Sequence, residues 1–364
     1  MIESISDGTP ESPREQGYRL PAEWEPHEAT WIAWPHNRGD WPGKFGSIER
    51  VYGEVVKGIA AGGERVRIVV GSDAEECRAK GVLSAAGVDA AAVEFFHFPT
   101  NRSWIRDYGP AFVLSTAPPE PRLAISDFGF NGWAKYPDWE LDDKIPAAVA
   151  RALGMRLFTP AGGFVLEGGA IDGNGRGTIV ATEDCLLDQS VQPRNPGLER
   201  LDVESVLCEY LGAGNVLWLP HGVAGDDTHG HVDDLCRFVA PSTLVVMSEA
   251  DERDPNFAPL RENVERLGEM RLEDGSKPEV ITLPMPEPLY FDGVRLPASY
   301  ANFYISNASV LVPTFNDPAD GLTLGILSEL FPDRRVVGIR SVDLVWGLGA
   351  LHCITREQPA LPRA

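Results

Sequence analysis

Short apolar segments alternate with longer amphipathic segments along almost the whole chain. The apolar segments, such as EATWIAWP (28–35) and STLVVMSEA (242–250), are rich in β-branched and aromatic residues and are bounded by Pro, Gly, Asn or Asp. This pattern is typical of buried strands, and the segments between them have the length and periodicity of helices. We therefore predict strands at 28–35, 66–72, 92–99, 111–114, 177–182, 215–220, 242–250, 309–315 and 335–339, and helices at 46–60, 74–86, 142–153, 198–212, 257–268 and 319–331. The alternation indicates an α/β fold.

The first 17 residues differ from the rest of the chain. MIESISDGTPESPREQG is polar and acidic, and it lacks the basic start and apolar stretch of a secretory signal. We predict a disordered lead-in over residues 1–17. Because no shift in composition marks a linker further on, we predict one domain over residues 18–364.

The spacing of the cysteines and the hydropathy of the chain are typical of a cytoplasmic protein. Its 5 cysteines are widely spaced and form no CxxC pair, which is a poor framework for disulfides. The apolar runs are far shorter than the roughly 18 residues that a membrane-spanning helix needs. The sequence therefore predicts a soluble cytoplasmic protein with free thiols.

The net charge of the chain indicates which classes of binding partner to expect. With 32 Lys and Arg against 54 Asp and Glu, the formal net charge is −22. Nucleic acids and anionic membranes require a basic surface, so the sequence excludes both as expected partners. A small cationic ligand is favoured.

Charged residues interrupt apolar or glycine-rich strand contexts at several points. Asp107 follows Arg106 within SWIRDYGPAFV, where a strand is expected to meet a turn, and Glu167 follows an apolar strand and precedes two glycines in FVLEGGAID. A structural Arg106–Asp107 pair and a solvated turn at Glu167 are the simpler alternatives. An acid at the end of a buried strand otherwise faces a ligand.

A histidine and a carboxylate recur in DDTHGHVDDLCRFVA. If HVDDLCRFV is a strand, His231 and Asp233 project from one face, where they can serve proton transfer or cation binding. Together with Asp226 and His229 they also offer ligands to a metal. Their spacing differs from that of an HExxH motif, whose two histidines lie on one face of a helix, so we predict no metal here.

Cys353 lies near the end of the chain in WGLGALHCITREQP. We expect it in an apolar strand that is entered through Gly347 and Gly349. A buried, inert cysteine is the common alternative, but a glycine-flanked thiol with His and carboxylates elsewhere suits nucleophilic catalysis. His352, one residue away on a strand, is expected to point to the opposite face and to be a poor base.

The intervals between these residues are nearly regular. Asp107 and Glu167 are 60 residues apart, Glu167 and His231 are 64 apart, and His231 and Cys353 are 122 apart, close to twice that interval. One inward-facing polar residue per βα unit is what a closed ring of repeated modules would supply to its axis. The length accommodates about five such units.

The ordered motifs of the chain resemble a known family. LPAEWEPHEATWIAWP, SWIRDYGPAFV, FGFNGWAKYPDWELDD, FVLEGGAID, GHVDD, ASYANFYISN and LHCITREQP, which lie between about Arg19 and Pro359, resemble agmatine deiminases and the related bacterial peptidylarginine-deiminase-type proteins. These are guanidino-group modifying enzymes. The resemblance implies a single closed domain with a pentein-like fold, a five-bladed α/β propeller with pseudo-fivefold symmetry.

The resemblance also implies roles for the candidate residues. Cys353 would be the nucleophile that attacks the guanidinium carbon, His231 the general acid and base, and Glu167 its partner. Asp107 and Asp233 would clamp the edges of the guanidinium. Trp104 is our candidate for a wall along the methylene chain of the substrate. The resemblance implies no metal and no organic cofactor, and it suggests a homo-oligomer.

The substrate is less closely defined than the reaction. Agmatine, converted to N-carbamoylputrescine and ammonia, is favoured because no clear cation stands ready for an α-carboxylate, although Arg106, Arg194 and Arg356 stay open as candidates. Ala350 and Arg356-Glu357 depart from the GGxNIHCITQQ motif of agmatine enzymes, which keeps peptidyl-arginine as the alternative. Two rivals are a metal-dependent amidohydrolase that uses Asp226, His229, His231 and Asp233, and a non-catalytic binder of guanidines or polyamines.

Overall fold

The computed structural model describes residues 12–119 and 121–362. Most of the predicted lead-in, residues 1–11, lies outside the described residues. Within its remainder, the backbone N–H of Arg14 donates to the carbonyl of Glu209 at 3.0 Å, which attaches this segment to a helix of the fold. The domain boundaries themselves stay predictions.

The strands form six sheets, and five of these follow one plan. A central strand pairs antiparallel with one neighbour and parallel with a strand that follows a helix. In spatial order the five sheets are β19 (Arg356–Pro359), β2 (His27–Ala33), β3 (Arg65–Val70), β4 (Val93–His97); β1 (Tyr18–Arg19), β5 (Ala111–Ser115), β6 (Arg122–Ser126), β7 (Arg156–Phe158); β10 (Asn215–Leu219), β9 (Thr178–Thr182), β8 (Ile171–Gly173); β11 (Cys236–Ala240), β12 (Thr243–Ser248), β13 (Glu279–Pro284); and β16 (Tyr304–Ile305), β17 (Ser309–Thr314), β18 (Arg335–Arg340). The sixth is a hairpin of β14 (Tyr290–Phe291) and β15 (Val294–Arg295).

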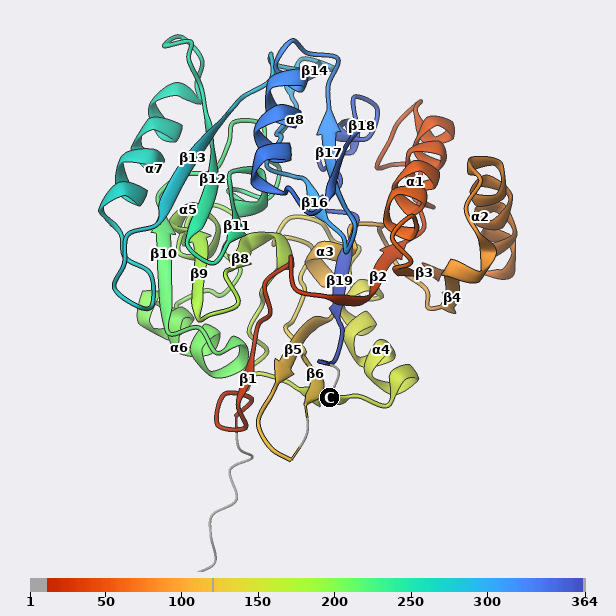
Figure 1. The fold of residues 1–364 in the computed structure, drawn as a ribbon, viewed down its shortest axis with the longest axis horizontal. Coiled ribbons are helices and arrows are strands. Elements are labelled where there is room, and N and C mark those ends of the chain that lie inside the picture. Colours follow the sequence, from red (N-terminus) through yellow and green to blue (C-terminus); the bar gives the residue numbers. More distant parts are fainter. Residues whose placement is uncertain (1–11, 120, 363–364) are drawn as a thin grey trace, which may run out of the picture.

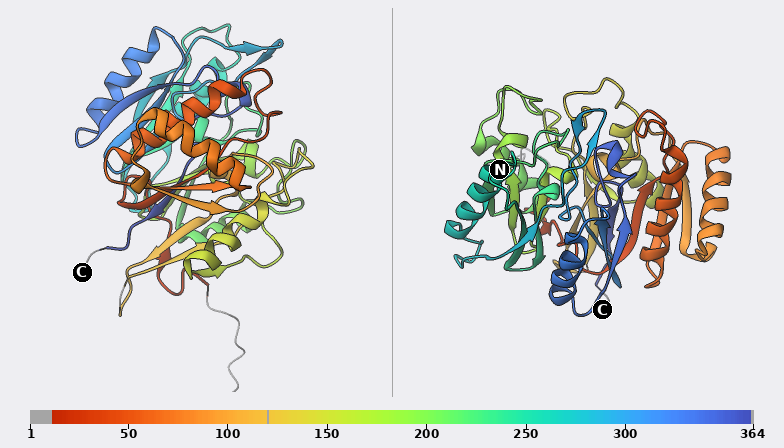
Figure 2. Two further views of the ribbon diagram at one scale, coloured as in Figure 1. Left: turned by 90° about the vertical axis from the view of Figure 1, so that its right-hand side faces the viewer. Right: turned by 90° about the horizontal axis from the view of Figure 1, so that it is seen from above.

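The longer helices α1, α2, α4, α6, α7 and α8 connect the parallel strands and lie on the outside of the molecule, whereas the short helix α3 is buried near its centre (Figures 1 and 2). The α-helices are α1 (Phe45–Ala60), α2 (Asp73–Ala86), α3 (Ile105–Tyr108), α4 (Ile145–Leu153), α5 (Glu183–Leu186), α6 (Arg200–Leu211), α7 (Phe257–Glu269) and α8 (Ala319–Leu330), and the short 3₁₀ helices are η1 (Ala90–Ala92), η2 (Asp142–Lys144), η3 (Gly168–Ala170), η4 (Val232–Asp234) and η5 (Val345–Gly347). The six helices and nine strands predicted from periodicity are all confirmed, within about three residues at their ends.

Helix α1 shows how successive sheets are joined. Its buried residues Ile48, Val51, Tyr52, Val55 and Ile59 recur at helical spacing and form one apolar stripe. This stripe packs on β3 of its own sheet and also on β17 and β18 of the sheet that precedes it around the molecule. Helix α7 contacts β10 and α8 contacts β13 in the same way, so each of these three helices bridges two neighbouring sheets.

The two ends of the domain meet in one sheet. Strand β19, near the end of the chain, pairs antiparallel with β2, near its start, with Arg356 opposite Trp31. No sheet in the described part of the chain closes on itself. The architecture is therefore an α/β fold of similar, sequentially packed units.

The core consists of three clusters of buried apolar side chains between the helices and sheets. One contains Trp31, Trp34, Trp41 and Trp104. Over residues 12–119 and 121–362, none of the helices combines the length and the apolarity needed to cross a bilayer.

Candidate active site

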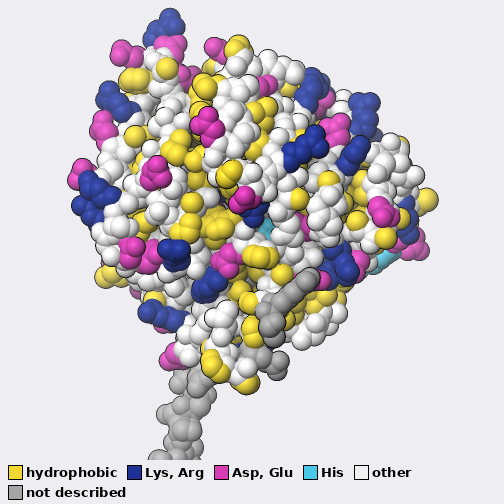
Figure 3. Space-filling model, viewed as in Figure 1, with side chains coloured by type: hydrophobic (Ala, Val, Ile, Leu, Met, Phe, Trp, Pro, Cys, Tyr) yellow, Lys and Arg dark blue, Asp and Glu magenta, His cyan; other side chains and the backbone are white. Residues whose placement is uncertain are grey.

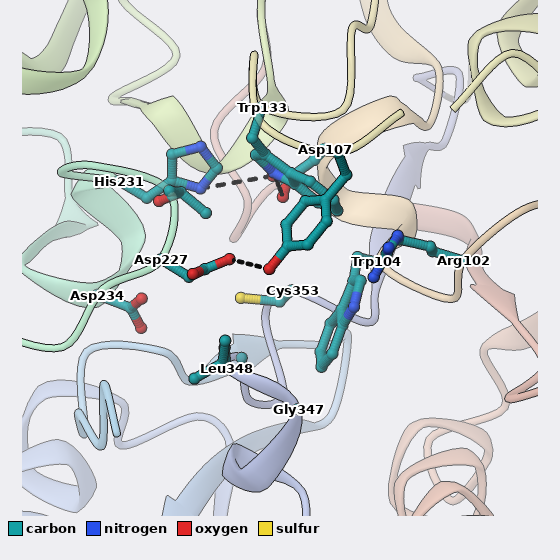
Figure 4. A pocket seen from close by; sticks show the side chains of 13 residues that line it. Arg102, Trp104, Asp107, Trp133, Asp227, His231, Asp234, Gly347, Leu348 and Cys353 are labelled. Atoms are coloured by element: carbon teal, nitrogen blue, oxygen red, sulfur yellow. Dashed lines mark hydrogen bonds and ion pairs between the residues drawn. The ribbon is translucent and has the colours of Figure 1, made fainter. Parts of the chain in front are cut away.

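A pocket with about 450 Å³ of space, including its open mouth, gathers residues from segments far apart in the sequence. Its lining includes Trp104, Asp107, His231 and Cys353, all of them predicted as site residues. In Figure 4, Cys353 faces the interior of this pocket, with His231 and Asp107 on one side and Trp104 on the other.

The predicted polar residues are brought together. His231 Nδ1 lies 3.7 Å from Asp107 Oδ1 and 3.9 Å from Asp233 Oδ1, while its Nε2 lies 3.9 Å from Glu167 Oε2. Cys353 Sγ lies 3.7 Å from Asp233 Oδ2. All five side chains are buried.

Asp107 stands on the short helix α3, not at the strand end that we expected. Trp133 Nε1 donates to its Oδ2 at 2.9 Å, and the backbone N–H of Gly169 donates to its Oδ1 at 3.0 Å. Burial, together with the charges of Asp233 and Glu167, raises the pKa of Asp107 to about 6 although His231 opposes this. The proposed Arg106–Asp107 pair is absent from the ion pairs of the described residues, and Arg106 binds Glu357 and Glu23.

Glu167 is fully buried, so the alternative of a solvated turn is wrong. Arg194 Nε donates to Glu167 Oε1 at 2.9 Å. Burial alone would raise the pKa of Glu167, but Arg194 and His231 outweigh it and lower that pKa to about 2. Its second oxygen, Oε2, is buried without a hydrogen-bond partner and faces the histidine.

His231 and Asp233 do not share a strand. Residues Val232–Asp234 form the 3₁₀ helix η4, and the strand starts only at Cys236. Asp226 Oδ2 accepts hydrogen bonds from the backbone N–H groups of Gly230 (2.6 Å) and His231 (2.8 Å), and Gly230 has φ +105°. These local bonds replace a strand ladder by a turn.

The environment of His231 favours its charged form. Burial lowers the pKa of its imidazole, but Asp107, Cys185 and Glu167 raise it well above the usual value. Asp233 Oδ1 and His231 Nε2 are both buried without a hydrogen-bond partner. Polar atoms of this kind are rare in protein interiors, and they are available to a ligand.

Cys353 lies in a turn over residues 351–354, and strand β19 begins only at Arg356, so the predicted strand at Cys353 is wrong. Asn302 holds this turn, because its Oδ1 accepts from the backbone N–H groups of His352 (2.9 Å) and Cys353 (3.4 Å). This fixes the amide so that Nδ2 donates to Cys353 Sγ at 3.1 Å and to Asp234 Oδ1 at 3.0 Å.

The nucleophile candidate is a thiol in this environment. Burial raises the pKa of Cys353 well above its usual value, and Asp233, Asp234 and Asp107 raise it further. Burial beside Asp233 also raises the pKa of Asp234 well above its normal range. A cation bound among these carboxylates would reverse the effect on the thiol.

Trp104 forms one wall of the pocket, as predicted, and its ring packs 5.1 Å from that of Trp41. The turn before Cys353 passes so close that a Cβ on Gly349 would lie 2.7 Å from the Trp104 ring. Only glycine allows this approach.

The mouth of the pocket carries residues that sequence analysis did not find. Tyr136 Oη donates to Asp227 Oδ2 at 2.6 Å, and Lys135 pairs with the same carboxylate. Arg102 binds Asp40 at 2.7 Å and Asp138 at 2.9 Å. Both cations at the mouth are thus already paired with carboxylates.

The residues of the metal alternative are not gathered into one group. His229 binds Asp188 at 2.8 Å, and Asp226 accepts backbone hydrogen bonds. Among the described residues, the one group with metal-ligand geometry is Glu167, Cys185 and His231. Arg194 already neutralises Glu167 there, which disfavours a second cation.

Comparison with known proteins assigns the chain to a group. A family model described as Porphyromonas-type peptidyl-arginine deiminase matches residues 19–359. An agmatine deiminase from Stutzerimonas stutzeri is 34% identical over 372 residues, which cover 96% of this chain and 97% of that protein.

Solved structures agree with these matches. Agmatine deiminase of Enterococcus faecalis superposes with a TM-score of 0.87 at 29% identity, covering 97% of this chain and 98% of that one. A cysteine-to-serine variant of C. jejuni agmatine deiminase with substrate bound gives a TM-score of 0.84 at 29% identity, covering 95% and 97%. The amidinotransferase SxtG from Microseira wollei shares the fold alone, with a TM-score of 0.52 at 13% identity over 95% of this chain and 99% of that one.

Proposed function

Since this chain belongs to the Porphyromonas-type peptidyl-arginine deiminase family, we propose that it hydrolyses the guanidino group of agmatine, giving N-carbamoylputrescine and ammonia. The observation that carries the proposal is a buried thiol, Cys353, in one pocket with His231 and three carboxylates. The substrate-bound relative supports a small guanidino compound as the ligand.

A planar cation fits the centre of the pocket. A Cβ on Gly169 would lie 2.6 Å from His231 Nδ1, 2.8 Å from Asp107 Oδ1 and 3.1 Å from Asp233 Oδ2, so these three groups converge on one point. A guanidinium presents its N–H donors in a flat fork that matches such carboxylates. Asp107 and the free Oδ1 of Asp233 would clamp its edges.

Free acceptors favour the same ligand. Glu167 Oε2 and Asp233 Oδ1 are both buried without a hydrogen-bond partner. A guanidinium carries five N–H donors and can satisfy such oxygens. Without a partner a buried polar group is costly.

The reaction then proceeds in two halves. As the cationic guanidinium binds, the Cys353 thiol releases its proton to solvent and Sγ bonds to the guanidinium carbon. His231, already protonated, gives its proton to the nitrogen that leaves; the C–N bond breaks, ammonia departs, and a thiouronium remains on Cys353. The now neutral His231 deprotonates water, which attacks that carbon, and the C–S bond breaks. The thiolate regains a proton from solvent, and the protonated ureido product gives its extra proton to ammonia, which becomes ammonium.

The far end of the substrate is best an amine. Arg102 and Lys135 at the mouth are paired with carboxylates, Arg194 is paired with Glu167, and Arg106 is paired with Glu23 and Glu357. Arg356 Nε donates to the carbonyl of Pro110. An α-carboxylate would therefore find no unengaged cation among these residues, whereas agmatine, which lacks that carboxylate, requires none.

One observation favours peptidyl-arginine as the second candidate. A groove with about 1140 Å³ of space shares Arg102, Tyr136 and Leu348 with the mouth of the pocket and extends to Phe291 on the β14–β15 hairpin. Its size would accommodate peptide residues on either side of an arginine. Blocking both ends of the peptide removes the α-carboxylate objection.

We also propose that the five similar sheets are the blades of one closed ring within a single domain, with the pocket near its axis. The sequential contacts of the helices with neighbouring sheets and the β19–β2 pairing support this arrangement. Assembly into a homo-oligomer stays a proposal, and sedimentation velocity of the purified chain would test it.

The experiment that tests the function is ammonia release in the presence of EDTA from agmatine, free arginine and a doubly blocked arginyl peptide. Wild type and Cys353→Ala run together, with Cys77→Ala as the control because Cys77 is an exposed residue of α2. We expect turnover of agmatine by wild type and Cys77→Ala, and loss of about 10⁴-fold or more in Cys353→Ala.

Each other outcome identifies a rival. Turnover of the peptide alone would retain the mechanism and replace the substrate. Activity that EDTA abolishes, or that survives Cys353→Ala, would point to the metal-dependent amidohydrolase. Agmatine binding without ammonia release would identify a non-catalytic binder.

A further inference from the structure

The ring of His352, the residue before Cys353, lies between two buried carboxylates. Its Nδ1 lies 2.7 Å from Asp233 Oδ2, and its Nε2 lies 2.8 Å from Glu23 Oε2. The three side chains are exposed by only 1%, 0% and 4%. Sequence analysis placed His352 on the far face of a strand, but the turn at residues 351–354 instead aims its ring beneath the pocket.

The number of N–H donors that the two contacts need indicates how many protons this ring carries. A neutral imidazole has one N–H donor, and an ionised carboxylate can only accept. If His352 were neutral, one of its two short contacts would place a nitrogen lone pair against a carboxylate oxygen. Two donors, and hence an imidazolium, satisfy both contacts.

Both carboxylates are ionised. Burial would raise the pKa of Glu23, but Arg237, His352 and Arg106 outweigh it and hold that pKa well below the usual value. Glu23 Oε1 also accepts from the backbone N–H of Ile305 at 2.8 Å. Burial would raise the pKa of Asp233 too, but the hydrogen bond from His352 and the charges of His231 and Arg237 together lower it.

Charged groups face His352 from every packed element. Glu23 precedes β2, Asp233 lies on η4, and Cys353 follows in the turn. Arg106 on α3 donates its Nε to the His352 carbonyl at 3.3 Å, and Arg237 on β11 binds Glu23 at 3.0 Å. The carboxylates touch the ring itself, whereas both arginines bind Glu23, so the nearest charges around the imidazole are negative.

The two oxygens of Asp233 have different partners. Oδ2 accepts from His352 and lies 3.7 Å from Cys353 Sγ, while Oδ1 is buried without a hydrogen-bond partner and lies 3.9 Å from His231 Nδ1. A bond that fixes Oδ2 therefore orients Oδ1. It also places a positive charge directly behind the carboxylate that opposes ionisation of the thiol.

We propose that His352 is a positioning residue that donates hydrogen bonds from both ring nitrogens, aims Asp233 Oδ1 at the guanidinium and offsets the charge of Asp233 beside Cys353. The ring touches neither substrate nor reacting atoms and acts through Asp233. Only the kinetic part of this inference rests on the proposed function.

The direct test is NMR of the full chain labelled with ¹⁵N-histidine. The resonances that disappear in His352→Gln belong to His352, and we expect both of its ring nitrogens to carry protons. A ring with one unprotonated nitrogen would overturn the proposal. This result does not depend on which substrate, if any, the protein turns over.

Kinetics and thiol reactivity give a second readout. In His352→Gln we expect kcat/KM for agmatine to fall roughly 10- to 100-fold with a raised KM. We also expect the pH at which iodoacetamide alkylates Cys353 to move upward, because the offsetting charge is gone. An unchanged KM together with an unchanged alkylation profile would contradict the proposal.

Two further variants keep the test informative. Glu23→Gln retains an acceptor for His352 but removes a charge. It should therefore move the alkylation pH of Cys353 upward by less than His352→Gln does, and it can be measured even if His352→Gln folds poorly. His97→Gln is the matched control, because His97 also lies between two carboxylates, Glu76 at 2.5 Å and Asp73 at 3.6 Å, but is 42% exposed on β4. It should match wild type in every readout.

Discussion

Asp107, which we propose as one clamp of the guanidinium, carries a charge that depends on pH near neutrality. Its carboxylate accepts hydrogen bonds from Trp133 and Gly169, yet burial beside Asp233 and Glu167 raises its pKa to about 6. Below pH 6 the carboxyl gains a proton and loses the charge that binds a guanidinium. Above pH 6 it is ionised and the clamp is complete.

We therefore predict that kcat/KM for agmatine falls about tenfold per unit below pH 6, with an acid limb that reports free-enzyme groups. Asp107→Asn should lower kcat/KM by about 10²- to 10³-fold, because it replaces one charged acceptor in a buried site. Initial rates between pH 4.5 and 8 measure both effects. A wild-type profile that stays flat down to pH 4.5 would rule out this role for Asp107.

The thiol of Cys353 is predicted to react slowly at neutral pH without substrate. Burial and the neighbouring carboxylates raise its pKa well above the ordinary value, so the nucleophilic thiolate is scarce at pH 7. Mass spectrometry of iodoacetamide-treated protein should show alkylation of Cys353 still increasing above pH 9. The exposed Cys77 supplies the internal reference for an ordinary thiol. Alkylation of Cys353 that is already maximal at pH 7 would mean that the resting enzyme holds a thiolate.

At this scale sequence motifs located Asp107, Glu167, His231, Asp233, Cys353 and Trp104 in one place, but not their partners. Asn302 reaches Cys353 from a segment 51 residues away in sequence, and Arg194 reaches Glu167 across 27 residues. The motif ASYANFYISN marks Asn302 as a polar residue among apolar ones. Its contact, however, depends on tertiary packing that no local pattern records.

At the scale of elements, η3 brings its backbone against three of the proposed site residues. Gly169 lies beside His231, Asp107 and Asp233, and a methyl group there would push these side chains away from the positions that we assign to guanidinium binding. Its backbone has no positive φ, so the requirement for glycine is one of space and not of conformation.

We predict that Gly169→Ala lowers kcat/KM by at least about 100-fold, since displacements near 1 Å have that effect on catalysis. The free energy of unfolding should fall by only about 1–3 kcal/mol, as for other overpacked sites. Gly81→Ala on α2 is the control, because nothing lies within 4 Å of its added Cβ. It should leave activity unchanged and stabilise the helix by about 0.5–1 kcal/mol. Equal activity in both variants would mean that the substrate binds elsewhere.

Elements with regular periodicity were predictable, and short turns were not. In helix α1 the pattern of apolar residues extends over several helical turns, and in strand β12 it extends over most of the strand. The 3₁₀ helix η4 and the turn before β19 contain only three or four residues, and side-chain bonds from Asp226 and Asn302 determine them. Both predicted strands at catalytic residues failed for this reason.

At the scale of the whole molecule, charge and repetition are the dominant features. The regular interval of about 60 residues predicted repeated units, and five sheets of one plan are present. Ring closure cannot be deduced from spacing, because it depends on how each helix packs on two sheets. On the face shown in Figure 3, acidic and basic side chains are interspersed, so the net charge of −22 acts as a general field there and not as one patch.

That field should assist a cationic substrate. We predict that kcat/KM for agmatine falls about two- to fivefold between 20 and 200 mM NaCl, while kcat stays constant, because salt screens long-range attraction but not the buried clamp. Choline chloride should give the same result as NaCl. A kcat/KM that is independent of ionic strength would show that encounter is not electrostatically guided.

The pairing of β19 with β2 has a consequence for the order in which the enzyme is made. Cys353 is fixed by a turn that ends where β19 begins, and β19 is held by a strand synthesised more than three hundred residues earlier. A nascent chain can thus build four of the five sheets before Cys353, our proposed nucleophile, is synthesised. With that role for Cys353, catalytic competence appears in one late step, when β19 joins β2, and a protease that clips this segment would inactivate the enzyme at once.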